Sequence, residues 1–157
     1  MRHPNEAVNL YSKNFNCCQS ILGSFGPDFD LNMEMVLKLG AGLSGGLAFH
    51  GETCGAVIGA CIILGLVNGS NDPSNDLAEQ TTYISVKEFL SDFKKKFGTT
   101  GCNKLFNTDV STPEGFELAQ ESSNTEIKNL NENCCANSTT TTDMAKITIF
   151  LSHARKG

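Results

Sequence analysis

The chain contains 157 residues, of which seven are cysteine, and it carries a net charge of −5. A chain of this length forms one domain, expected over residues 1–157, and can fold without disulfides or metals. The acidic balance and the lack of clustered basic residues argue against nucleic acids and anionic membranes as partners, because both bind positive surfaces. The first residues are polar and contain no apolar leader, so we expect a cytoplasmic protein.

The first expected helix runs from about Pro4 to Phe25, because apolar residues recur there at steps of three and four. Cys18 lies on its central apolar stripe, where a free cysteine usually acts as a small hydrophobic residue. Cys17 lies about 100° round the helix and is therefore expected to face a neighbouring element. Asp30 then caps a short helix that precedes a glycine-rich turn.

The next expected helix covers residues 53–67, where nearly every side chain is apolar or small. Thr53 would be its N-cap and would place Cys54 in the first turn, where free N–H groups and the helix dipole stabilise a thiolate. Gly55 and Gly59 leave one face bare, so another helix can approach closely, within the chain or across a dimer interface. We expect this helix to be central, because it is apolar on nearly all faces.

A membrane span is the alternative interpretation of this segment. Residues 43–67 are long enough to cross a bilayer, and the Gly55-x-x-x-Gly59 spacing is a membrane packing motif. His50 and Glu52 interrupt the segment, however, and leave an apolar stretch of only about 14 residues, which suits a buried helix. We therefore expect no membrane-spanning helix.

The longest helix is expected to start at Asp72-Pro73 and to stop at Gly98. The basic run 94–96 falls in its last turn, where cations interact favourably with the helix dipole. A short capped helix follows, with Cys102 near its positive end. The expected buried face of the long helix consists of Leu77, Ile84, Leu90, Phe93 and Phe97.

The chain becomes polar from residue 107 to residue 142, with a capping box that predicts a short helix from Pro113 to Ala119. Cys134 and Cys135 lie in this polar region, where no packing pattern requires a cysteine, so we expect a chemical role for at least one of them. Residues 137–142 resemble a linker before a last amphipathic helix at 144–154. No convincing strand pattern occurs, which predicts an all-α bundle of about five to seven helices.

The spacing of the cysteines limits the chemistry. Cys17, Cys54, Cys102 and Cys134 are separated by 37, 48 and 32 residues, which excludes the local C-x-x-C motifs of ferredoxins, zinc ribbons and thioredoxin-like enzymes. A shared site would have to be assembled by the tertiary structure. Four thiolates can hold an iron–sulfur cluster or a zinc ion, and they can also form two disulfides.

Several of these residues recur in the order of a known family. The chain resembles the C_GCAxxI_C_C proteins, which are described as redox-active and are similar to the non-haem part of split-Soret cytochromes. The resemblance covers roughly residues 5–135 and implies an iron–sulfur centre, a redox partner protein and a homodimer. Without a C-x-x-C-H motif, it implies no covalent haem. It rests on Asn16-Cys17, the block from Gly51 to Ala60, Cys102 with Leu105, and Cys134-Cys135, and it assigns Cys17, Cys54, Cys102 and either Cys134 or Cys135 as the family cysteines.

Two functional hypotheses follow. In the first, a cysteine-ligated metal centre, expected to be an iron–sulfur cluster with zinc as the alternative, carries electrons. In the second, the protein is a thiol–disulfide oxidoreductase without metal, with Cys54 as the attacking thiolate and Cys17 or Cys102 as the resolving thiol. Cys61 shares a helix face with Cys54 but has apolar neighbours, so it is expected to stay an unreactive thiol. A scaffold protein with cysteines in its core is a third interpretation, which the polar setting of Cys134-Cys135 disfavours.

Overall fold

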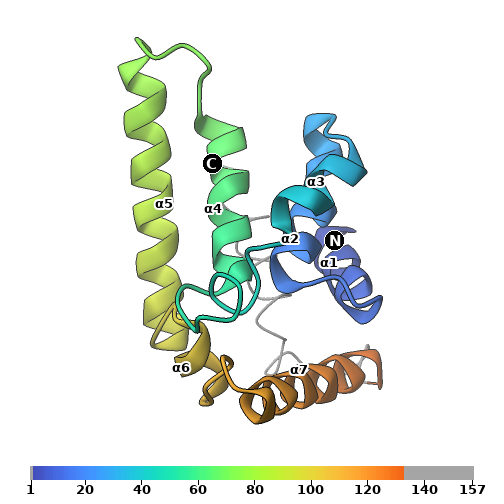
Figure 1. Cartoon of the computed structure of the whole chain (residues 1–157). Helices are drawn as coiled ribbons and strands as arrows, with labels where there is room; N and C mark the ends of the chain where they lie inside the picture. The colour runs from blue at the N-terminus through green and yellow to red at the C-terminus, as the bar shows by residue number, and fades with distance from the viewer. Residues whose placement is uncertain (1, 133–157) are drawn as a thin grey trace.

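The computed structural model describes residues 2–132 of the chain (Figure 1). This part is all-α, as predicted, and contains no strand beyond one isolated bridge. The predicted linker at 137–142, the predicted helix at 144–154, Cys134 and Cys135 lie outside the described residues. The helices are α1 (Arg2–Ser12), α2 (Cys17–Phe25), the 3-10 helix η1 (Gly26–Phe29), α3 (Met33–Gly40), α4 (Gly55–Asn68), α5 (Asp76–Phe97), α6 (Cys102–Phe106) and α7 (Pro113–Glu132).

Helix α4 lies between α2 and α5, and the main hydrophobic core forms around it (Figure 1). Its glycine-bearing face packs on α2. A Cβ atom at Gly59 would lie only 3.1 Å from the Cβ atom of Ile21 and 3.4 Å from the carbonyl oxygen of Cys18. The tight helix contact expected at the bare face therefore occurs within the chain. The core around α4 includes Ile21, Phe25, Val57, Ala60, Phe89 and Phe93.

The single helix expected from Pro4 to Phe25 is wrong, because the chain breaks it into α1 and α2. Asn14 has a φ of 68°, a left-handed conformation that ends α1. Asn16 then caps α2 with a complete capping box, in which Gln19 is the reciprocal partner. Both asparagines are visible in the sequence, but the unbroken apolar spacing conceals the turn that they form.

Two other helix starts also differ from expectation. The N-cap of α3 is Asn32 and not Asp30, which instead adopts a left-handed conformation at the end of η1. Helix α5 begins after Asn75, whose side chain accepts a hydrogen bond from the backbone of Ala78. Asp72 caps a separate turn before it by accepting hydrogen bonds from Ser74. In each case a nearby polar side chain competes for the same role, and the sequence pattern does not rank them.

Helix α5 is the longest in the described range and ends at Gly98, as predicted. Its expected buried face is wrong in the first half, since Leu77 is 75% exposed and Ile84 is 56% exposed. The second half is confirmed, because Phe93 is buried in the core and Leu90 and Phe97 pack against it, and Phe89, which was not predicted, joins them. The exposed first half of α5 lies beside the end of α4, at the opposite end of this helix pair from α6 (Figure 1).

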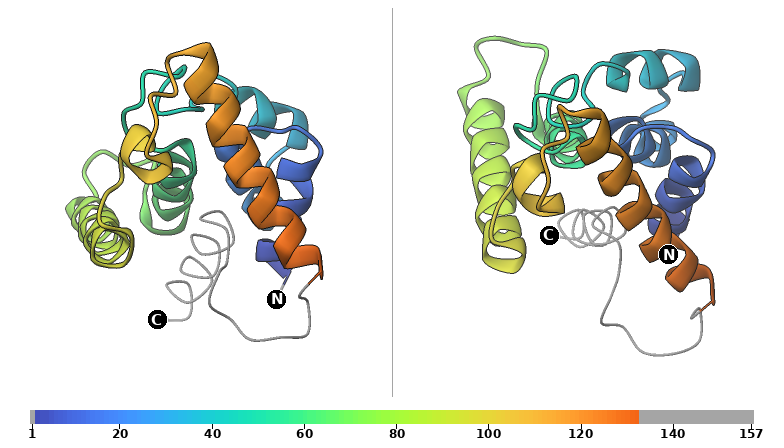
Figure 2. Two further views of the ribbon diagram at one scale, coloured as in Figure 1. Left: turned by 90° about the horizontal axis from the view of Figure 1, so that it is seen from below. Right: turned by 60° about the horizontal axis from the view of Figure 1, so that its bottom comes forward.

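Helices α6 and α7 close the other end of the fold. Helix α7 extends to Glu132, well beyond the predicted end at Ala119. Figure 2 shows it crossing from the loop that precedes α4 toward α1. Within residues 2–132, no helix is both long enough and apolar enough to cross a membrane.

The contact between α2 and α4 predicts opposite effects for two glycine substitutions in the same helix. Gly59→Leu should lower the free energy of unfolding by about 1–3 kcal/mol or more, because the added side chain meets Ile21 and the backbone of Cys18. Gly65→Ala is the control, since a Cβ atom at Gly65 meets nothing within 4 Å. It should raise stability by about 0.5–1 kcal/mol through its higher helix propensity. Urea unfolding measures both, and equal effects would contradict the packing described.

Candidate functional site

Cys17 is the first residue of α2, and a side chain next to it ties this helix to the end of α3. The Asn16 side chain accepts a hydrogen bond from the backbone of Gln19 and donates hydrogen bonds to the carbonyl oxygens of Gly40 and Ala41, both at 3.1 Å. The loop that follows α3 therefore begins beside Cys17. The sulfur of Cys17 also lies at a helix start, where backbone N–H groups are free to bind an anion.

This loop has an unusual backbone over residues 45–49, which all have positive φ values, from 49° at Ala48 to 69° at Gly46. A left-handed conformation costs roughly 1–2 kcal/mol for each residue other than glycine, and three of the five are not glycine. Hydrogen bonds across the loop offset this strain. They run from Ala48 N–H to Gly42 C=O, from Phe49 N–H to Ser44 C=O, from Gly51 N–H to Gly45 C=O and from Glu52 N–H to Gly46 C=O.

A short backbone pairing brings Cys54 and Cys102 to the same place. An isolated antiparallel bridge joins Thr53 to Gly101. It places the residue that starts α6 next to the residue that precedes α4, although 48 positions separate them in the sequence. The flanking hydrogen bonds run from Cys54 N–H to Thr100 C=O at 2.8 Å and from Cys102 N–H to Glu52 C=O at 2.6 Å.

Cys54 is the N-cap of α4, one position earlier in the helix than expected, and α4 covers residues 55–68 instead of 53–67. Thr53 is not the cap, because the bridge to Gly101 holds it in extended pairing. The Cys54 side chain makes no capping hydrogen bond, although the nearby backbone N–H of Ala56 acts to lower the pKa of its thiol.

The surroundings of Cys17 and Cys54 shift their pKa values in opposite directions and favour a negative charge on Cys17. The Cys54 thiol donates a hydrogen bond to the Cys17 sulfur, and this lowers the pKa of Cys17 to about 6. The Ser44 hydroxyl, 3.7 Å away, and the backbone N–H groups of Gly45 and Cys18 stabilise the same thiolate. The hydrogen bond to Cys17 and burial raise the pKa of Cys54 well above its ordinary value.

This order is the reverse of the expected one, in which Cys54 was the thiolate with the lowered pKa. Both sulfurs lie at helix starts, so helix position alone does not decide between them. Desolvation opposes a charge on either sulfur. Cys17 has more hydrogen-bond donors, because Ser44, Gly45 and the Cys18 N–H act on it in addition to Cys54, and these donors favour the charge on Cys17.

The remaining described cysteines are neutral thiols. Burial raises the pKa of Cys18 to about 12 and that of Cys61 to about 11, in line with the unreactive roles expected for both. Burial also raises the pKa of Cys102 to about 11, and the charge on Cys17 adds to this increase. Cys102 is therefore a third thiol close to the pair, and it is fully protonated at neutral pH.

Gly55 is the position that makes room for the charged sulfur. A Cβ atom there would lie 2.6 Å from the sulfur of Cys17 and would also collide with the carbonyl oxygen of Leu43. Only glycine fits between the start of α4 and this sulfur. In the sequence, Gly55 predicted only a helix face without side chains. It did not predict that the Cys17 sulfur packs on this face.

Sequence reasoning missed Tyr11, which belongs to α1. Its hydroxyl forms a hydrogen bond with Ser123 of α7, and burial raises its pKa. The charges of Cys17, Cys54 and Cys102 raise this pKa further, so the phenol lies within electrostatic reach of all three sulfurs. No spacing rule could have found this, because the contact depends on how α7 crosses α1.

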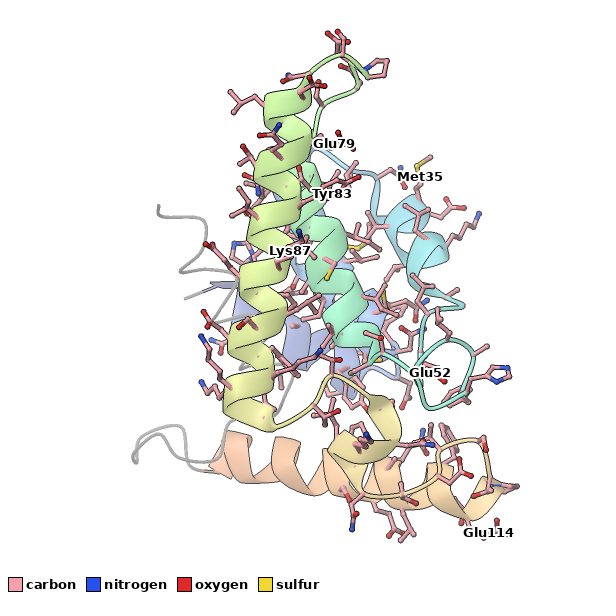
Figure 3. All side chains as sticks on the ribbon, turned by 90° about the vertical axis from the view of Figure 1, so that its left-hand side faces the viewer. Met35, Glu52, Glu79, Tyr83, Lys87 and Glu114 are labelled. Atoms are coloured by element: carbon pink, nitrogen blue, oxygen red, sulfur yellow. The ribbon has the colours of Figure 1, made fainter. Side chains whose placement is uncertain are left out.

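The described residues alone do not form a metal site. Within residues 2–132, no three Cys, His, Asp or Glu side chains are placed to hold a metal ion together. The expected further ligands, Cys134 and Cys135, lie outside this range. His50 and Glu52 are exposed, Glu52 on the loop near α6 (Figure 3), and their side chains play no part in the site.

The chain belongs to the family described as "Putative redox-active protein (C_GCAxxG_C_C)", whose model matches residues 15–148. The central motif in this family name ends with a glycine, whereas the pattern quoted above ends with an isoleucine. The chain has both residues at this point, as Ile58 followed by Gly59. Comparison with curated proteins and with solved structures finds no match. The family therefore establishes a redox-active class of protein, and it leaves the chemistry of the centre to be proposed.

The lowered pKa of Cys17 predicts how fast iodoacetamide alkylates this cysteine at different pH values. The rate should reach half its maximum near pH 6 and level off above it, because the thiolate is the reactive form. Ser44→Ala should move this midpoint upward by about one unit, since a hydrogen bond to a charged group contributes roughly 1.5 kcal/mol or more. The neighbouring Cys18 is an internal control that should remain unmodified. A midpoint above pH 8 in the unaltered protein would contradict the charge assignment.

Proposed function

We propose that this protein is a thiol–disulfide redox protein whose reactive pair is Cys17 and Cys54. The observation that carries the proposal is the juxtaposition of the two cysteines: the Cys17 sulfur lies against Gly55, the residue that follows Cys54, and hydrogen bonding with Cys54 lowers the pKa of Cys17. Two cysteines from different helices are thereby held sulfur to sulfur, with one proton between them. A dithiol of this kind exchanges two electrons with a disulfide.

The reaction follows from the order of the two pKa values. The Cys17 thiolate attacks one sulfur of a substrate disulfide, a mixed disulfide forms, and the other substrate sulfur leaves as a thiolate. Cys54 then loses its proton to the departing thiolate or to water and attacks the sulfur of Cys17. The Cys17–Cys54 disulfide forms, and the second substrate thiol is released. The substrate disulfide is reduced to two thiols, and the protein pair is oxidised.

The lowered pKa supports Cys17 as the attacking sulfur, in place of Cys54 as first expected. Cys17 is half-buried, whereas Cys54 and Cys102 are buried. At pH 7 a group with a pKa of about 6 is mostly ionised, while its modest basicity keeps it nucleophilic. Cys54 is placed to resolve the mixed disulfide, and Cys102 lies near enough to the pair to serve as a third thiol.

A cysteine-ligated metal centre, most simply an iron–sulfur cluster that carries single electrons, is the second candidate. It is favoured by the convergence of Cys17, Cys54 and Cys102 from three segments, with backbone N–H groups directed at two of the sulfurs. Since these three do not complete a site by themselves, Cys134 or Cys135 would have to supply a further ligand. Zinc is the alternative metal for the same ligands.

The setting in which the protein works is part of the proposal. We infer a redox partner protein as the electron source or acceptor, a homodimer as the assembled form, and the cytoplasm as its location. A reducing compartment is consistent with the five described cysteines, all of which are free thiols. Neither a nucleic acid nor a membrane is proposed as a partner, because the chain is acidic.

Equilibration with glutathione buffers of graded potential tests the dithiol proposal. Mass mapping should show a Cys17–Cys54 disulfide that appears over a single two-electron transition. Cys17→Ser and Cys54→Ser should each abolish it. Cys61→Ala is the matched control, because Cys61 lies two turns further along α4, has apolar surroundings and should leave the transition unchanged. A disulfide that links Cys17 to another cysteine, or no disulfide in any buffer, would contradict the proposed pair.

Metal analysis separates the two candidates. The protein is purified without oxygen, and its iron, zinc and acid-labile sulfide are measured. The dithiol proposal predicts less than about 0.1 metal ion per chain together with full titration of Cys17 by a thiol reagent. Stoichiometric iron and sulfide that are lost in both Cys17→Ser and Cys102→Ser, and retained in Cys61→Ala, would establish the cluster instead.

A further inference from the structure

The left-handed run at residues 45–49 contains an aromatic side chain that no step of the proposed reaction uses. Phe49 ends this run and is 38% exposed. Its ring folds back over Gly45, so that a Cβ atom at Gly45 would lie 2.9 Å from Cγ of Phe49. The backbone N–H of Gly45 is one of the donors to the Cys17 sulfur. Phe49 therefore packs directly on the peptide that contacts the reactive thiolate.

A second aromatic ring holds Phe49 in this place. Phe116, in the first turn of α7, packs edge-on against it with ring centroids 4.9 Å apart. Edge-on contact is a preferred arrangement of aromatic pairs. Helix α7 begins close to the loop in the views of Figure 2, and the contact joins the two segments across more than 60 positions of the chain. The order of contacts is Phe116 on Phe49, Phe49 on Gly45, and Gly45 on the sulfur of Cys17.

We propose that Phe49 is a positioning residue for Cys17: clamped by Phe116, it holds residues 45–49 in the left-handed conformation that directs the Gly45 N–H and the Ser44 hydroxyl at the sulfur. The proposal rests on the proposed dithiol function, in which the Cys17 thiolate is the attacking group. A strained backbone relaxes unless surrounding contacts hold it, and Phe116 supplies such a contact from outside the loop by packing on Phe49.

The clamped loop and the Cys17 thiolate stabilise each other. If the clamped loop favours the thiolate, the thiolate must favour the clamped loop to the same extent. Oxidation of Cys17 and Cys54 to a disulfide removes the negative charge, so the Gly45 and Ser44 donors lose a charged acceptor.

The test measures the pH midpoint of Cys17 alkylation in the full chain with Cys18→Ala, which removes the adjacent thiol. Phe49→Ala should raise the midpoint by about one pH unit through loss of the Gly45 hydrogen bond, and so slow alkylation at pH 6 roughly fivefold. Phe116→Ala should act in the same direction, because it removes the clamp without touching the loop. Phe49→Tyr keeps the ring and should restore the original midpoint.

Leu47→Ala is the matched control, since Leu47 lies in the same left-handed run but is 45% exposed. Its midpoint should not change. The proposal is overturned if Phe49→Ala and Phe116→Ala both leave the midpoint near pH 6, or if Leu47→Ala raises it equally. If Phe49→Ala loses its helical circular dichroism, Phe116→Ala decides the question alone. A midpoint above pH 8 before any substitution overturns the proposed function as well, so the two failures are distinguishable.

Discussion

The close approach of α2 to α4 is the constraint on which the site depends. Side-chain-free positions at Gly55 and Gly59 allow the two helices to pack almost backbone to backbone, with the sulfur of Cys17 against Gly55. Both helix starts then meet, and each start carries a cysteine. A larger residue at either glycine would separate the helices before it disturbed anything else, because protein interiors leave little room for added atoms. The glycines are therefore part of the proposed redox site, although they have no chemistry of their own.

Two thiols placed this close cannot both ionise, and the surroundings decide which one does. Ser44 and Gly45 of the loop after α3, together with the Cys18 N–H, supply hydrogen-bond donors to Cys17, whereas the pKa of Cys54 is raised. The asymmetry that a dithiol needs, one attacking thiolate and one resolving thiol, thus follows from the number of donors. Membership of a redox-active family agrees with this chemistry, and the family resemblance alone did not indicate which sulfur carries the charge.

The sequence predicted what depends on local patterns. The all-α class, the central glycine-bearing helix and the stop at Gly98 are each determined by residues within one segment. It did not predict features that require two distant segments to meet: the pairing of Thr53 with Gly101 that brings Cys102 to the site, the Tyr11 hydroxyl beside three sulfurs, and the left-handed loop. The charge order of Cys17 and Cys54 belongs to this second group, because it depends on donors from two other elements.

The most direct test of the account follows each cysteine separately by nuclear magnetic resonance. In the reduced full chain labelled with ¹³C at the cysteine Cβ atoms, thiol ionisation shifts the signal of the carbon next to the sulfur. We expect the Cys17 signal to titrate with a midpoint of about 6, while the Cys54, Cys61 and Cys102 signals stay at their thiol positions at neutral pH. Titration of Cys54 before Cys17, or of neither below pH 8, would contradict this expectation.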